Sequence, residues 1–138
     1  MSSALKTTLN NTILNALPSD LRSVIKTCYK WYGTGNATSN GTWGGCKIWL
    51  PLEYEMFGAN TYSPTTERTT GNARQYPIFT NNASRIKKTN NGSGSANYYW
   101  LASPHAGYGN YFCGVGSDGA ADTSNASNGF GVCFGLCV

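Results

Sequence analysis

Apolar residues in the first part of the chain recur at intervals of three and four residues, the spacing of one face of a helix. This pattern predicts an amphipathic helix over residues 3–17, which Pro18 ends. Ser19 can then cap a second helix, and Asp20 lies favourably near its positive N-terminal end. We expect the two helices to pack as a pair, and the second to bury four residues: Leu21, Val24, Ile25 and Cys28.

The next part of the chain alternates between a polar stretch and an apolar run. Residues 32–45 are rich in Gly, Thr and Asn and are predicted to be a long irregular loop. Residues 46–50 form a short apolar run, which predicts a buried strand. We expect Trp43 and Trp49 to anchor this region.

A short helix is predicted after Pro51, and Gly58 can end it in a left-handed cap. Residues 59–94 hold Thr, Asn, Pro and Gly with few apolar side chains, which is typical of a long loop. We expect aromatic and aliphatic side chains to hold this excursion in place, and they are Tyr62, Tyr76, Ile78 and Phe79.

The rest of the chain reads as strands separated by turns. Residues 97–101 and 111–115 are strongly strand-forming, and residues 117–119 are a turn signal. Large apolar residues alternate with Gly and Cys over residues 130–138, which predicts a last strand with one face on the core. The polar insert between the last two strands is therefore expected to be ordered, exposed and tolerant of substitution.

Composition shows a chain rich in aromatic residues, at 13%, and poor in charged ones, at 12%. All Lys and Arg lie at or before Lys88, whereas residues 89–138 carry only Asp118 and Asp122 as charges. Because basic residues are not interleaved with the aromatic ones, we expect no nucleic-acid binding. No apolar run approaches the roughly 18 to 20 residues of a membrane helix, and we expect neither membrane insertion nor a signal peptide in this chain.

The cysteines and the single histidine offer little chemistry. Five cysteines are an odd number for a disulfide framework, so buried free thiols are expected. Cys133 and Cys137 would stand about 13 Å apart along one strand, too far for a bond. His105 could serve Ser103 or Cys113 as a base, but no spacing in the sequence ties them together.

The carboxylates do not form a catalytic pattern either. Glu53 and Glu55 lie two positions apart on a short helix, where their side chains diverge. Asp118 and Asp122 lack the regular ligand spacing of a calcium loop. We therefore predict no catalytic residue, no metal ion and no cofactor.

The tail, residues 101–138, has a distinctive amino-acid composition. After Trp100 the chain contains no Lys, Arg, Glu, Gln, Met or Trp, and it relies on Gly, Ser, Asn, Asp, Ala, Tyr and Phe. Tyrosine among small polar residues is typical of adaptable binding loops. A low-complexity turn region has a similar composition, so this observation leaves both interpretations open.

Several motifs resemble the DUF6273 family of lectin-like domains, which occur at the C-termini of phage and gut-bacterial proteins. The motifs are LPSDLRSVIK (17–26), LPLEYEMFG (50–58), YWLASP (99–104), FCGV (112–115), DG (118–119), AS (126–127) and GVCFGLCV (131–138). This resemblance covers nearly the whole chain. The family commonly has arginine at the position of Ala102 and a small or basic residue at that of Cys133, so a salt bridge of that arginine does not carry over.

The family is similar in turn to C-type-lectin-fold domains of the formylglycine-generating-enzyme type. That fold is also the scaffold of variable proteins made by diversity-generating retroelements, in which Asn codons are randomised but cannot become Lys, Glu, Gln, Met or Trp. The tail is compatible with this rule. The copper-holding cysteine pair of the enzymes and the calcium motifs of the lectins do not carry over.

The resemblance and the residues together imply one α+β domain over residues 1–138, and whether it is the C-terminal domain of a longer protein is left open. Its expected fold is a C-type lectin fold of the formylglycine-generating-enzyme-like subtype, with two helices packed on a small twisted antiparallel sheet and long irregular loops. Trp43, Trp49 and Trp100 should fix those loops.

We expect a non-catalytic, diversified ligand-binding protein on a phage tail (virion) or bacterial cell surface. Its partner would be a host-cell surface protein or glycan, and a homo-oligomer is left open. The alternatives are a structural virion module and an oxidase-like enzyme of the formylglycine-generating fold that uses Cys133, Cys137 or His105. The expected ligand-binding residues are His105, Tyr108, Asn110, Tyr111, Gly114, Gly116, Asp118, Asp122, Thr123, Asn125, Asn128 and Phe130.

Overall fold

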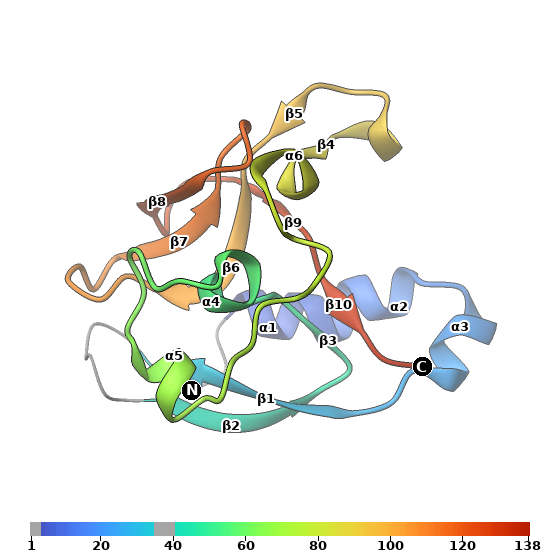
Figure 1. Ribbon diagram of the computed structural model, residues 1–138. Helices are drawn as coiled ribbons and strands as arrows, with labels where there is room; N and C mark the ends of the chain where they lie inside the picture. The colour runs from blue at the N-terminus through green and yellow to red at the C-terminus, as the bar shows by residue number, and fades with distance from the viewer. Residues whose placement is uncertain (1–3, 35–40) are drawn as a thin grey trace.

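The computed structural model describes residues 4–34 and 41–138, so the predicted helix start at Ser3 and residues 35–40 of the predicted loop lie outside the described residues. The fold is mixed α+β, with short helices and small sheets (Figure 1). Among the described residues no helix is long and apolar enough to cross a membrane.

The predicted N-terminal helix is confirmed and runs through α1 (Ala4–Thr8), the π-helical turn η1 (Leu9–Ile13) and α2 (Leu14–Ala16). Leu9 lies on the side of this helix that faces the sheet, and its side chain is buried there. Asn10 ties the helix to the chain beyond it, because its Oδ1 accepts hydrogen bonds from the backbone N–H of Lys47 (2.9 Å) and Ile48 (3.2 Å).

The second helix, α3 (Ser19–Val24), forms as predicted but buries less than expected. It contains no buried residue, and Val24 is 53% exposed. Ile25 and Cys28 lie beyond its end, and the Ser19 side chain does not cap it because the N-cap position belongs to Pro18. The helix ends after less than two turns, so the predicted buried stripe is wrong for Val24, whereas Ile25 is buried as predicted just beyond the helix end.

The predicted loop over residues 32–45 is wrong wherever the structure describes it. β1 (Cys28–Gly33) and β2 (Gly41–Cys46) pair as an antiparallel hairpin. Trp31 is the buried anchor, at 2% exposure, whereas Trp43 is 52% exposed. Gly41 of β2 makes room for that ring, because a Cβ added at this position would stand 1.9 Å from Trp31.

The short elements around residue 50 follow the prediction. β3 (Ile48–Trp49) is buried, and α4 (Glu53–Phe57) ends at Gly58 in a left-handed conformation with φ of 67°. Short elements interrupt the excursion that follows. They are α5 (Thr66–Thr69), α6 (Asn82–Arg85), β4 (Lys87–Lys88), the 3-10 turn η2 (Asn90–Gly92) and β5 (Ala96–Asn97).

The central sheet has the strand order β8-β7-β6-β9. Its members are β6 (Tyr99–Pro104), β7 (Tyr111–Val115), β8 (Ala121–Asn125) and β9 (Gly131–Val132). Two pairs are antiparallel, but β9 runs parallel to β6. The expectation of a purely antiparallel sheet is therefore wrong at this edge, because the chain crosses over the sheet before it returns beside β6.

The predicted last strand is split into two. β9 belongs to the central sheet, whereas β10 (Gly135–Leu136) pairs with β3 in a separate sheet. The alternation of large and small residues is retained on both sides of the break. Phe134 and Val132 both pack against one core, and Cys133 packs against the other.

Both faces of the central sheet are covered by apolar clusters. One face packs Tyr99, Leu101, Cys113 and Val115 against Met56 and Phe79. The opposite face packs Trp100 and its partly buried neighbours against the N-terminal helix and β3, through Leu9, Ile48 and Leu50. The exposed Ile78, by contrast, does not hold the excursion as predicted, because its side chain is 71% exposed.

Candidate ligand-binding surface

Three of the predicted residues meet at the end of the central sheet where β7 begins. The His105 ring lies 4.7 Å from that of Tyr108 and 6.4 Å from that of Tyr111, and the two tyrosine rings are 5.7 Å apart, all between centroids. Tyr62 joins them, with its ring 6.0 Å from that of His105. We call these four residues the aromatic cluster.

Backbone hydrogen bonds hold the loop that carries this cluster. The N–H of His105 donates to Tyr111 O (3.0 Å), and the N–H of Tyr111 donates to Tyr108 O (3.2 Å). His105 Nδ1 accepts from the N–H groups of Gly107 (2.8 Å) and Tyr108 (3.2 Å). Because Nδ1 is an acceptor, the ring proton lies on Nε2, which has no partner in the described part of the chain.

Tyr62 was not predicted as a site residue, and a buried carboxylate places it. Glu53 Oε2 accepts hydrogen bonds from the N–H of Tyr62 (3.1 Å) and of Ser63 (2.8 Å). The N–H of Ala106 in turn donates to Tyr62 O (2.8 Å). Nothing in the sequence places Tyr62 beside His105, because that contact depends on hydrogen bonds of Glu53 that only the structure shows.

Polar residues of the tail border the aromatic cluster. The register of β7 and β8 sets Asn125 opposite Tyr111, and the N–H of Ala126 donates to Asn110 O (2.9 Å). Asn125 Oδ1 accepts a hydrogen bond from the N–H of Ser127 (3.1 Å). Tyr108 is 62% exposed, so this border is open to solvent.

The other predicted residues lie elsewhere. Asp118 belongs to the turn beyond the opposite end of β7, a strand that spans about 13 Å from Tyr111 to Val115. Gly114 and Gly116 are buried, and a Cβ on Gly114 would stand 3.0 Å from Tyr99 O.

The remaining predicted ligand-binding residues are Asp122, Thr123, Asn128 and Phe130. Asp122 and Thr123 are half-buried within β8, and Asn128 donates to Ser124 Oγ from the turn after it. The Phe130 ring packs at a tilt against that of Trp100, with 4.5 Å between centroids, and is partly buried on the helix side of the sheet. The twelve residues therefore divide into one group around the aromatic cluster and several scattered positions.

The thiols and hydroxyls suggested as nucleophiles do not approach His105. Cys113 is buried, burial raises the pKa of its thiol, and the thiol contacts Pro104 O (3.8 Å). Ser103 Oγ is buried and accepts from the N–H of Glu53 (2.7 Å). Within the described residues, no group of three or more His, Cys, Asp and Glu side chains could hold a metal ion.

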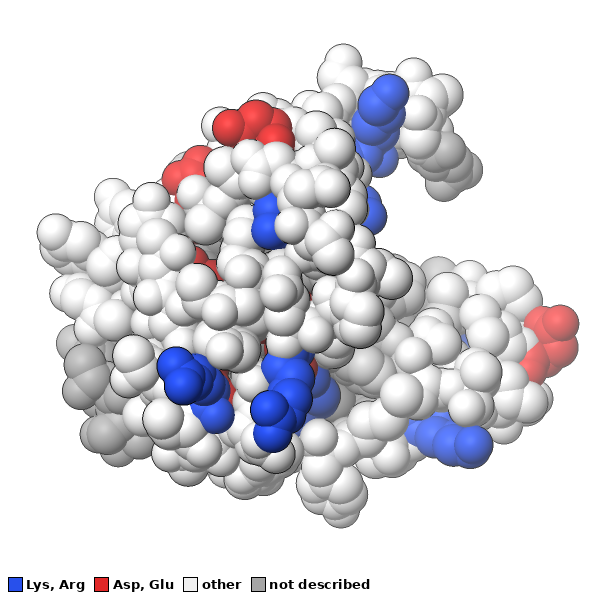
Figure 2. Space-filling model, viewed as in Figure 1, with Lys and Arg blue, Asp and Glu red and all other residues white. Residues whose placement is uncertain are grey.

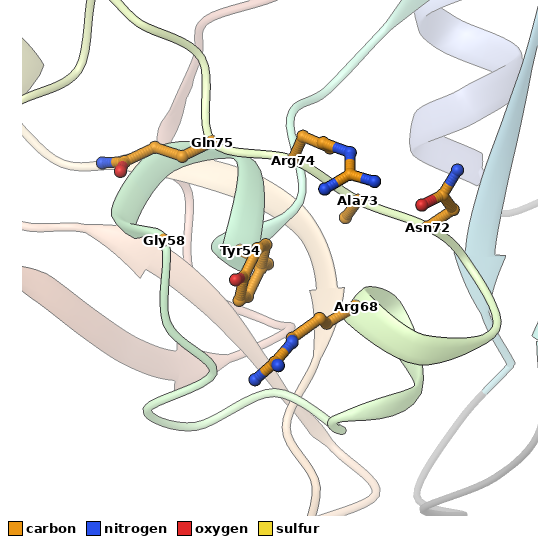
Figure 3. A pocket seen from close by; sticks show the side chains of 7 residues that line it. All are labelled: Tyr54, Gly58, Arg68, Asn72, Ala73, Arg74 and Gln75. Atoms are coloured by element: carbon orange, nitrogen blue, oxygen red, sulfur yellow. The ribbon is translucent and has the colours of Figure 1, made fainter.

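Two pockets lie apart from the aromatic cluster. The first, of about 390 Å³, is lined by Tyr54, Gly58, Arg68, Asn72, Ala73, Arg74 and Gln75 (Figure 3). In that view the guanidinium groups of Arg68 and Arg74 point in different directions, so they do not converge on one ligand atom.

The second pocket, of about 190 Å³, lies beside the β4–β5 arm and includes Lys87, Lys88 and Tyr98. On the face seen in Figure 2, a hollow separates this arm from the end of the molecule that carries α2 and α3. The linings of both pockets contain none of the twelve predicted residues.

Comparison with known proteins gives one match. No curated protein sequence and no solved structure matches the chain. A family model described as "Domain of unknown function (DUF6273)" matches residues 1–138. Because that match covers the sequence from end to end, the chain belongs to the DUF6273 family.

Proposed function

We propose that the protein is a non-catalytic ligand-binding domain that recognises a host-cell surface protein or glycan. The observation that carries this proposal is the aromatic cluster, in which an exposed Tyr108 is held beside His105 by backbone hydrogen bonds. A tyrosine fixed in this way loses little conformational entropy on binding, so its apolar area contributes more to affinity.

The chemistry around the cluster favours an uncharged ligand. The polar groups at its border are the amides of Asn110 and Asn125 and the Nε2–H of His105. None of these carries a charge when the histidine is neutral. Aromatic faces with amide donors and acceptors suit the C–H and hydroxyl groups of a sugar, or the backbone and apolar side chains of a protein.

The proposal extends to the fold subtype and to the biological setting. We infer a C-type lectin fold of the formylglycine-generating-enzyme-like subtype, used as the variable protein of a diversity-generating retroelement on a phage tail or bacterial surface. The mixed α+β fold and the absence of Lys, Glu, Gln, Met and Trp after Trp100 support this inference. A near-copy of the coding region of the tail, differing at adenines and next to a reverse transcriptase gene, would establish it, and absence of such a copy would remove the case for diversification.

Binding is tested with the purified, fluorescently labelled protein on a glycan array and on whole bacterial cells. Tyr108→Ala should weaken binding about tenfold or more, because it removes the exposed ring of the cluster. Tyr29→Ala is the matched control, since Tyr29 is 73% exposed on the β1–β2 hairpin and outside the cluster. Equal binding of the wild type and Tyr108→Ala would contradict the proposal.

Further measurements test the two alternative functions. Loss of particle assembly with unchanged cell binding would indicate a structural virion module. Copper binding, or an activity lost in Cys137→Ser, would indicate an enzyme instead. In the structure the two cysteines of that alternative lie apart, with Cys133 against the core and Cys137 exposed near the C-terminus.

A further inference from the structure

Three chain segments that are distant in sequence meet beside the C-terminal strand. Cys28 lies directly opposite Cys46 in the β1–β2 hairpin, and Leu136 lies opposite Ile48 in the β3–β10 pair. The backbone N–H of Lys26 donates to Cys137 O (2.9 Å). Figure 1 shows the same arrangement, with the C-terminus beside the segment that leads from α3 into β1. Three of the five cysteines are therefore neighbours.

Side-chain contacts distinguish which two of the three face each other. The side chain of Cys28 lies close enough to that of Cys137 for the two thiols to interact. Cys46 Sγ instead contacts Tyr32 Oη (3.0 Å) and the backbone carbonyl of Cys28 (3.6 Å). Cys46 is buried, whereas Cys137 is exposed and Cys28 is half-buried. An oxidant in solution can therefore reach Cys137 first and Cys28 next.

We propose that Cys28 and Cys137 form a reversible disulfide that fastens the C-terminal strand to the start of β1. With oxidised glutathione as the oxidant, the Cys137 thiolate attacks one glutathione sulfur and breaks the glutathione disulfide, which releases one glutathione thiolate. The Cys28 thiolate then attacks the Cys137 sulfur of this mixed disulfide and releases the second. The two protein thiols lose two protons and two electrons, and two reduced glutathione molecules are formed.

The surroundings of Cys28 set this order of attack. The interaction with the Cys137 side chain and burial both raise the pKa of the Cys28 thiol, while the nearby Lys30 ammonium opposes that shift. A thiol that is protonated and half-buried reacts slowly with a bulky oxidant. It becomes a good resolving group once Cys137 carries the mixed disulfide, since the two side chains are already neighbours.

The bond would close a loop that contains most of the chain. Cross-links across long loops restrict the unfolded chain most, so the oxidised protein should be the more stable form. The cross-link would act on β10 directly, because that strand ends at Leu136, next to Cys137. Neither the aromatic cluster nor its loop contains a cysteine of this group, so binding at the cluster is a separate property.

The test is oxidation of the full chain in a glutathione buffer, followed by alkylation of free thiols and mass spectrometry of a non-reduced digest with trypsin and chymotrypsin. Cleavage after Phe134 separates Cys133 from Cys137, so the linked cysteines can be assigned. We expect two of the five thiols to be protected from alkylation and a linked peptide that joins Cys28 to Cys137. Five reactive thiols, or a link between Cys28 and Cys46, would overturn the proposal.

Variants supply the controls. Cys46→Ser should still form the bond, whereas Cys137→Ser should not. The melting temperature of the wild type should rise by several degrees on oxidation and fall again with dithiothreitol, and that of Cys137→Ser should not respond. A linked wild type whose melting temperature does not change would contradict the fastening of the strand.

Discussion

Trp31 lies between two glycines, and this single side chain organises the β1–β2 hairpin. A Cβ on Gly41 would stand 1.9 Å from the Trp31 ring, and one on Gly71 would stand 3.0 Å from it. The sequence analysis named Trp43 as an anchor of this region and did not name Trp31, which is the buried one. Which of two neighbouring tryptophans is buried depends on the glycine supplied by another segment, and such tertiary information is not contained in the local pattern.

Gly41→Ala should lower the free energy of unfolding by about 1–3 kcal/mol, because the added methyl group would displace a buried tryptophan ring. Gly129→Ala is the matched control, since nothing lies within 4 Å of a Cβ at that position. Urea denaturation followed by tryptophan fluorescence measures both. A Gly41→Ala protein as stable as the control would show that the ring can move aside without loss.

Glu67 is a fully buried acid whose position predicts a dependence of stability on pH. Burial raises the pKa of its carboxyl group from 4.5 to about 7, against the opposing effect of hydrogen bonds that Oε2 accepts from Ser63 Oγ (3.1 Å) and the N–H of Tyr54 (3.4 Å). The folded protein therefore holds this proton more tightly than the unfolded chain does. The contribution of this carboxyl group to the free energy of unfolding is fully present below about pH 4.5, where the group is protonated, and is lost as the pH rises through 7.

Between pH 5 and pH 8 the free energy of unfolding should fall by up to about 3 kcal/mol more in the wild type than in Glu67→Gln. The amide stays neutral at every pH and keeps the shape of the protonated acid. Urea titrations of both proteins at several pH values measure the difference. Parallel pH profiles would mean that the carboxyl group titrates equally in the folded and unfolded states.

At the scale of elements, the strands that were predicted are those with strong apolar patterns of their own, such as β6 and β7. β8 has the sequence ADTSN, which contains few strand formers, and it forms because β7 offers it a partner along its whole length. The break between β9 and β10 could not be predicted, because the alternation over residues 130–138 continues across it. Pairing partners decide such cases, and they come from elsewhere in the chain.

Besides its apolar contacts, the N-terminal helix is joined to the chain at β3 by the hydrogen bonds of Asn10, so Asn10 should matter more than its neighbour Asn11. Its amide also donates to Ile48 O (2.9 Å), which adds to the two bonds that it accepts. Asn10→Ala should cost about 2–4 kcal/mol, because it leaves backbone groups of a buried strand without partners.

The control for this change is Asn11→Ala, since Asn11 is exposed on the same helix. Thermal melts followed by circular dichroism at 222 nm compare the two. If both variants melt together, the helix docks through its apolar side chains alone.

At the scale of the whole molecule, the two apolar clusters share one sheet, so neither can be lost without the other. Met56 packs on one face and Leu9 on the opposite face. The same organisation determined how much of the site was predictable. His105, Tyr108 and Tyr111 are close in sequence and were predicted together, whereas Tyr62 reaches them through a loop that Glu53 holds.

Met56→Ala and Leu9→Ala should therefore each lower the free energy of unfolding by about 2–5 kcal/mol. In both variants the protein should still unfold in a single transition, at a lower temperature than the wild type. Differential scanning calorimetry and near-ultraviolet circular dichroism should give the same midpoint for each variant. Two separate transitions in either variant would mean that the clusters unfold independently.

The parallel position of β9 beside β6 has a consequence for synthesis on the ribosome. Phe130, Val132 and Phe134 cover one apolar cluster of the core. They are translated after the residues that they cover, which are Leu9, Leu50 and Trp100. A nascent chain that has been made only to the end of β7 exposes this apolar surface until residues 130–134 leave the exit tunnel. The domain therefore has to fold after its translation, and chaperones that bind nascent chains would have a defined apolar target during that interval.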